Sequence, residues 1–60
     1  MNKVYLVYKS NNNKEQNLLS VHESKQSAYR SKHKYEDSYV GQLKASDMFD
    51  FYVVEKYVID

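Results

Sequence analysis

FYVVEKYVID, residues 51–60, is the stretch of sequence that decides the fold. It combines β-branched and aromatic residues without Gly or Pro, a composition typical of a packed β-strand. Alternate residues of a strand point to opposite faces, and this stretch is apolar on both. We therefore expect a central strand that needs cover on both faces. One helix can cover one face, so a loop, a second copy or a partner protein is expected on the other.

The length and composition predict a single domain over residues 1–60 with a thin stability margin. A chain of this size buries only about 60% of the surface that its unfolded form exposes. The absence of cysteine removes disulfides and thiolate zinc sites as sources of stability, and it fits a reducing cytoplasm. No cofactor is expected. Oligomerisation or partner binding is the stabilising device that remains.

The net charge of +1 argues against both a strongly acidic DNA mimic and a strongly basic nucleic-acid coat. The longest apolar runs, residues 4–8 and 51–54, are too short to span a bilayer, and no signal-peptide pattern opens the chain. These features predict a soluble cytoplasmic protein without a membrane partner.

Two strands are expected before the helix. Residues 1–9 are predicted to form a strand that is apolar on both faces, with Val4, Leu6 and Tyr8 on one face and Tyr5 and Val7 on the other. The polar residues 10–17 are expected to form a loop. Residues 18–22 are predicted to form a short strand that pairs with the first as an antiparallel hairpin at a sheet edge.

A continuous helix is expected to begin after Ser24, a good N-cap residue, and to end at Gly41, the only glycine. One arc of this helix carries Ala28, Tyr29, Tyr35, Tyr39 and Val40. Lys32 falls within the arc. Either its stem lies along the sheet while its ammonium reaches water or Glu36, or the helix breaks near His33.

The order strand, strand, helix, strand predicts an α+β fold of β-β-α-β type. We expect a three-stranded antiparallel sheet in the order 2-1-3 with one helix packed on one face. Residues 42–50 form the connector, and residues 46–49 could form a helical turn. Met48 and Phe49 in this connector either plug the end of the core or project as anchors for a partner.

The sheet face away from the helix is the expected contact surface. If the odd-numbered residues of the last strand form the core, that face carries Tyr52, Val54 and Val58, and we group Tyr5 and Val7 with them. The opposite assignment stays open, because a one-residue change of register exchanges the two faces. The expected partner-binding residues are Tyr5, Val7, Met48, Phe49, Tyr52 and Val54.

Three segments, VYLVY at 4–8, LLSVHESKQSAY at 18–29 and FYVVEKYVID at 51–60, resemble small uncharacterised β-β-α-β proteins of bacteria and their phages. The resemblance spans most of the chain, rests on structural positions and carries no catalytic motif. The Asn- and Lys-rich composition is similar to that of phage accessory proteins, which implies binding to a host enzyme or defence complex. We therefore expect a non-enzymatic protein-binding module, an inhibitor or modulator of a host protein, with a homodimer as a further expectation.

A nucleic-acid-binding regulator is the alternative. Its expected contact residues are Lys25, Arg30, Lys32 and Lys34, which cluster in the helical segment. Lys25 and Lys32 fall on the apolar side of the helix, however, while Arg30 and Lys34 fall opposite. The basic residues are thus spread around the helix instead of lying along one side of it. This arrangement favours the protein-binding hypothesis.

No catalytic or metal site is expected. A single glycine excludes the phosphate-cradling loops of nucleotide-binding proteins. The spacing of His22 and His33 matches no usual metal-ligand pattern, and a small ribonuclease using one of them as general base is the only enzyme worth testing.

Overall fold

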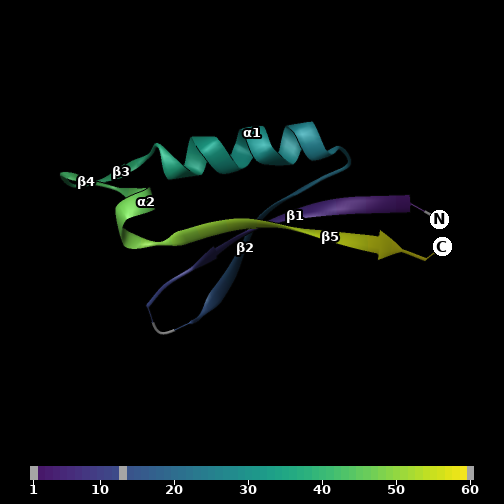
Figure 1. The fold of residues 1–60 in the computed structure, drawn as a ribbon, viewed down its shortest axis with the longest axis horizontal. Helices are drawn as coiled ribbons and strands as arrows, with labels where there is room; N and C mark the ends of the chain where they lie inside the picture. The colour runs from purple at the N-terminus through teal and green to yellow at the C-terminus, as the bar shows by residue number, and fades with distance from the viewer. Residues whose placement is uncertain (1, 13, 60) are drawn as a thin grey trace.

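The sheet is antiparallel and three-stranded, with one long helix on one side (Figure 1). A computed structural model describes residues 2–12 and 14–59. Strands β1 (Asn2–Ser10), β2 (Gln16–His22) and β5 (Asp50–Val58) stand in the order β2-β1-β5. The expected β-β-α-β fold and the order 2-1-3 are thereby confirmed. Residues 1 and 60, which we had placed in the first and last strands, lie outside the described residues.

The last strand is an edge strand, so the expectation that it is central was wrong. The short loop after β1 brings β2 back along one side of β1. The chain returns from the helix and β5 pairs with the other side of β1, from Asn2 opposite Val58 to Ser10 opposite Asp50. β1 therefore occupies the centre, because it is the strand with two neighbours.

Helix α1 (Lys25–Glu36) begins as the sequence predicts. The Ser24 hydroxyl accepts the backbone N–H of Ser27 at 3.2 Å, which satisfies one of the otherwise unpaired donors of the first turn. The helix runs unbroken through His33, and the Lys32 ammonium lies 3.0 Å from a carboxylate oxygen of Glu36. The helix is therefore not broken near His33, and the Lys32 ammonium reaches Glu36 as the first alternative expects.

The end of α1 differs from the expectation, because the helix stops at Glu36 rather than at Gly41. The Ser38 hydroxyl donates to the Tyr35 carbonyl at 2.7 Å, and the Ser38 backbone N–H contacts the same carbonyl at 3.3 Å. Serine competes with helix continuation by bonding to nearby backbone groups in this way. The chain leaves the helix axis here, which removes Tyr39 and Val40 from the predicted arc.

A two-stranded hairpin begins where the last turn of the helix was predicted, and one helical turn follows it in the connector. Strand β3 (Tyr39–Val40) pairs with β4 (Leu43–Lys44) around Gly41, whose φ of +67° favours glycine. The turn α2 (Ala45–Met48) follows, close to the expected helical turn at 46–49. This segment leads into β5 at the end of the sheet (Figure 1).

The sheet register shows which face the helix covers. Val7 lies opposite Ser20 on one side and Val53 on the other, and the Ser20 hydroxyl lies 3.4 Å from that of Ser31 in α1. Odd-numbered residues of β1 and β5 therefore face the helix, and Val7 is 0% exposed. Grouping Tyr5 and Val7 with Tyr52 and Val54 was wrong. Both faces of β1 are apolar, so alternation alone could not fix its register against β5.

The core is small and the molecule is elongated. Its buried apolar residues, within the described chain, are Val7, Ala28 and Ala45. The radius of gyration of 12.5 Å exceeds the value of about 10 Å typical of a compact chain of this length, and the Cα extents are 43 × 23 × 10 Å. The fold is thus a thin two-layer unit with one side of its sheet left open.

Candidate protein-contact surface

The side of the sheet away from α1, which we call the open face, carries eight apolar side chains. Two rows cross all three strands: Val21 beside Leu6 beside Val54, and Leu18 beside Tyr8 beside Tyr52. Val4 and Val58 extend this surface toward the start of β1. The open face therefore consists of Val4, Leu6, Tyr8, Leu18, Val21, Tyr52, Val54 and Val58.

A β-bulge brings both Leu18 and Val21 to the open face. The register shifts by one residue between Val7, opposite Ser20, and Tyr8, opposite Leu18, so that Leu19 is the extra residue. Without the shift, Leu18 and Val21 would point to opposite sides, because they are three positions apart. Sequence reasoning missed five members of the surface: Val4, Leu6, Tyr8, Leu18 and Val21. The alternation of Val4, Leu6 and Tyr8 along the first strand was a signal for three of them.

Much of this apolar surface is in contact with water. Leu18 and Val21 are 52% and 55% exposed, and Val54 and Val58 are 38% and 39% exposed. The whole chain exposes 4719 Å², against about 4,100 Å² expected for a monomeric protein of 7.2 kDa. The excess of about 600 Å² of exposed surface approaches the roughly 800 Å² of accessible surface that each partner buries in a standard protein interface.

Tyr8 and Tyr52 lie side by side in the row of the open face nearest to Ser10 and Asp50. Their rings stack at a centroid distance of 5.6 Å and an angle of 14°. The Tyr52 hydroxyl is out of reach of solvent and has no hydrogen-bond partner in the described part of the chain. Such a group lowers stability, because it lost its bonds to water on folding without replacement.

Replacing Tyr52 with phenylalanine is expected to stabilise the fold by about 1 kcal/mol, because it removes the buried unpaired hydroxyl and keeps the stacked ring. In a domain of this size that corresponds to a rise in Tm of about 4–8 °C. Thermal unfolding followed by circular dichroism measures the change. Tyr8→Phe, in the same stacked pair, is the matched control and should leave Tm nearly unchanged. A lower Tm for Tyr52→Phe would show that the hydroxyl is bonded.

Met48 and Phe49 do not lie on the open face, and both are half-buried. The Phe49 ring meets Phe51 edge to face at 6.5 Å, and the Lys9 ammonium lies 4.4 Å from the Phe49 ring centroid. Phe49 also lines a cavity of about 130 Å³ between the end of α1, α2 and the sheet. These contacts support the core-plug alternative for Phe49 and place it apart from Tyr52 and Val54.

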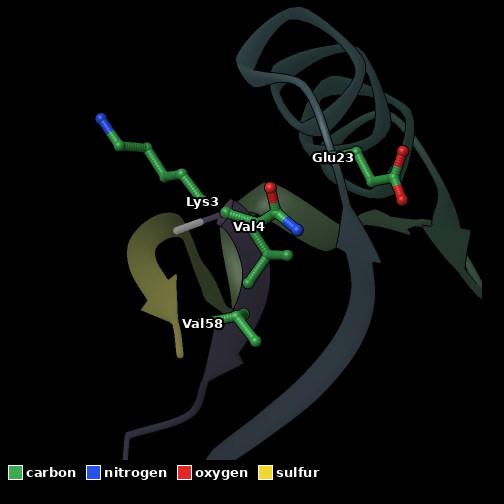
Figure 2. A pocket seen from close by; sticks show the side chains of 5 residues that line it. Lys3, Val4, Glu23 and Val58 are labelled. Carbon is green, nitrogen blue, oxygen red and sulfur yellow. The ribbon is translucent and has the colours of Figure 1, made fainter. Parts of the chain in front are cut away.

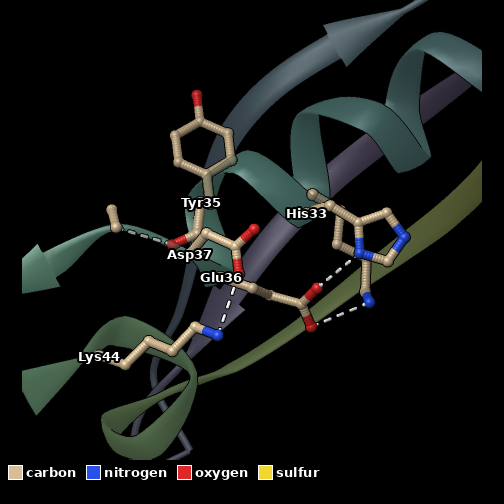
Figure 3. Close-up of polar contacts among 7 residues, drawn as sticks. His33, Tyr35, Glu36, Asp37 and Lys44 are labelled. Carbon is tan, nitrogen blue, oxygen red and sulfur yellow. Dashed lines mark hydrogen bonds and ion pairs between the residues drawn. The ribbon is translucent and has the colours of Figure 1, made fainter.

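The basic residues of α1 are partly neutralised within the helix. The two carboxylate oxygens of Glu36 contact different residues (Figure 3). One lies 3.0 Å from the Lys32 ammonium, and the other lies 3.1 Å from the Nδ1 of His33. Lys25 lies 6.0 Å from the ring centroid of Tyr29. Arg30 and Lys34 are exposed. The structure therefore does not gather the candidate nucleic-acid residues Lys25, Arg30, Lys32 and Lys34 into one uncompensated stripe.

The contacts of His22 link β2 to the start of α1. Its Nε2 lies 2.8 Å from the Ser20 hydroxyl and its Nδ1 lies 2.9 Å from the Ser27 hydroxyl. Hydroxyl partners at both nitrogens orient the ring without supplying charge. Residues 2–12 and 14–59 contain no group of three or more His, Asp or Glu side chains that could hold a metal ion.

A hollow of about 560 Å³ lies at the end of the sheet where β1 begins, lined by Asn2, Lys3, Val4, Glu23 and Val58. Lys3 extends away from Val4 and Val58 (Figure 2). Its ammonium lies 2.6 Å from Glu55 and 5.0 Å from the ring centroid of Tyr57. The hydrogen bond from Lys3 lowers the pKa of the Glu55 carboxyl, and the same bond raises the pKa of Lys3. The Lys3 ammonium is therefore paired with groups of the protein itself.

Comparison of the chain with protein-family models, with curated proteins and with solved structures finds no match. Within residues 2–12 and 14–59, no helix has the length and apolar character needed to cross a bilayer.

Proposed function

We propose that the protein is a small non-enzymatic protein-binding module that acts by contact through its open face. The observation that carries the proposal is the two apolar rows, which cross all three strands and hold no charged residue. Isolated apolar side chains on a surface need no explanation, whereas a contiguous patch marks an interaction site. A protein partner is the occupant that matches eight apolar side chains and a stacked tyrosine pair.

The surroundings of the rows also suit a protein partner. Ser10, with Asp50 opposite it, borders the two rows at one end. Lys56, opposite Val4 and between Val54 and Val58 on β5, borders them at the other. An apolar centre with a polar rim is the usual anatomy of a protein interface. Tyrosine is also among the residues most enriched at the centre of such interfaces, because its ring is large and rigid.

The partner that we propose is a host protein, an enzyme or defence complex of a bacterial cell, which the module inhibits or modulates in the cytoplasm. This part of the proposal rests on the resemblance to small β-β-α-β proteins of bacteria and their phages. A contact module needs no chemistry of its own to inhibit, because covering a functional surface is sufficient.

Affinity capture with matched variants tests the proposal. The bait is purified protein in bacterial lysate, washed with nuclease and high salt. Wild type and Arg30→Ala/Lys34→Ala are expected to retain the same protein in stoichiometric amount, and Leu18→Asp/Val21→Asp is expected to lose it. Truncation of a hot-spot residue, one of the few that carry most of the binding energy, costs about 2 kcal/mol or more, which is about 30-fold in affinity.

Two outcomes would contradict it. Retention of the captured protein by a folded Leu18→Asp/Val21→Asp variant would show that the open face is not the contact surface. Capture that disappears with nuclease or with Arg30→Ala/Lys34→Ala would support the nucleic-acid alternative, whose binding weakens steeply with salt.

A further inference from the structure

The two edges of the sheet differ in how they are protected against further pairing. The β2 edge is shorter, at seven residues, and is interrupted by the bulge next to Val7 and Tyr8. The β5 edge runs for nine residues, Asp50–Val58, in unbroken register with β1 and without proline. Bulges, short strands, proline and charged side chains are the devices that normally protect a sheet edge. The β5 edge lacks the first three, and its charged residues, Asp50, Glu55 and Lys56, are of both signs. No strand of the described chain pairs with its outer side.

We propose that a second copy of this chain pairs with the β5 edge, strand β5 antiparallel to β5, about a twofold axis at Val54. An antiparallel pair of identical strands has its twofold axis perpendicular to the sheet, so opposed residues belong to the same face. Centring the axis on Val54 pairs every residue of Asp50–Val58. The product is a continuous six-stranded sheet with both copies of α1 on one side.

The side chains of β5 fit this register. Val54 lies opposite its own copy, Tyr52 lies opposite Lys56 of the second copy, and Val53 lies opposite Glu55. No like charges are opposed, and each Tyr52–Lys56 pair places an ammonium next to an aromatic ring. Moving the axis to Glu55 would instead place two carboxylates opposite one another, which is destabilising.

The shape of the monomer also points to a second copy. Its surface exceeds that of a typical monomer of this mass by about 600 Å², and its core holds three buried apolar residues in the described chain. Chains with so small a core usually need a further source of stability, and this chain has no cysteine. Pairing at β5 would join two open faces into one surface of twice the length. The inference goes beyond the proposed function, because the dimer requires no target protein.

Engineered cysteines test the pairing, since the natural chain has none. Opposed residues of an antiparallel pair have Cα atoms about 4.5–5.5 Å apart, within the range that a disulfide spans. Val54→Cys is expected to form an intermolecular disulfide roughly 10-fold faster than Val21→Cys, because pairing holds the two thiols together at high effective concentration. The copies of Val21 would stand five strand spacings apart, about 24 Å.

A second pair of variants tests the register independently of Val54. Tyr52→Cys and Lys56→Cys are each expected to form no intermolecular disulfide under mild oxidation, because each cysteine then lies opposite a residue that is not cysteine. Their mixture is expected to give the mixed disulfide. Light scattering of the wild type should give twice the monomer mass. All these measurements use the purified protein without lysate. A negative result therefore counts against the dimer and not against binding of a target protein.

Three results would overturn the inference. Disulfide formation by Val21→Cys as fast as by Val54→Cys would mean that two open faces pack against each other. A wild type that stays monomeric at all concentrations would exclude the dimer. Absence of the mixed disulfide between Tyr52→Cys and Lys56→Cys would refute the register centred on Val54.

Discussion

Replacing Val7 with aspartate is expected to abolish folding. Val7 is 0% exposed at the centre of β1, on the side covered by α1. An unpaired charge in such a place costs several kcal/mol. A natural domain of 60 residues has about 3–9 kcal/mol of stability, so the loss takes most or all of it. Circular dichroism should show an unfolded chain with no thermal transition.

Val21→Asp is the matched control for this prediction. It makes the same chemical change one strand away, at a residue that is 55% exposed on the open face. We expect this variant to keep the fold and to lose about 1 kcal/mol, because aspartate is a poor strand former. If Val7→Asp folded and Val21→Asp did not, the assignment of the two sheet faces would be reversed.

The elements themselves could be predicted from sequence because their signals are local. The Ser24 cap lies next to the first helical residue, and the β-branched and aromatic composition of residues 51–58 marks a strand. The strand order followed from the sequence of elements and from the rule that connections are short and right-handed. Only the order 2-1-3 lets the helix return the chain to the free side of β1.

The membership of the contact surface could not be predicted, because it depends on long-range register. β1 is apolar on both faces, so alternation gave no preference for pairing Val7 with Val53 rather than with Tyr52 or Val54. The bulge at Leu19 has no glycine or proline to mark it and is set by pairing with β1.

The early end of α1 was missed because two local signals compete at the end of the helix. Tyr39 and Val40 fit the helical arc, and the Ser38 bond to Tyr35 that ends the helix is a local competitor of similar strength.

Replacing Phe51 with alanine is expected to destabilise the fold by about 3 kcal/mol. Its ring stacks on Tyr35 of α1 at 6.5 Å and 5°, and meets Phe49 edge to face at 6.5 Å. Phenylalanine to alanine changes in cores cost about 3–5 kcal/mol, and Phe51 is half-buried, which favours the lower end. The substitution would also enlarge the cavity of about 130 Å³ that Phe51 lines. We expect Tm to fall by more than about 10 °C.

Combining Phe51→Ala with Phe49→Ala decides which of the two roles Phe49 has. If Phe49 plugs the end of the core, the effects of the two substitutions are coupled. The double variant should then lose less free energy of unfolding than the two single variants lose together, by about 0.5–1.5 kcal/mol. If Phe49 is an anchor for a partner, Phe49→Ala should leave Tm almost unchanged and reduce capture of the target. Tyr57→Ala, on the same strand but 59% exposed, is the control for loss of an aromatic ring from β5 and should lower Tm only slightly. Because Phe49 contacts both the Phe51 ring and the Lys9 ammonium, we expect coupling and unchanged capture.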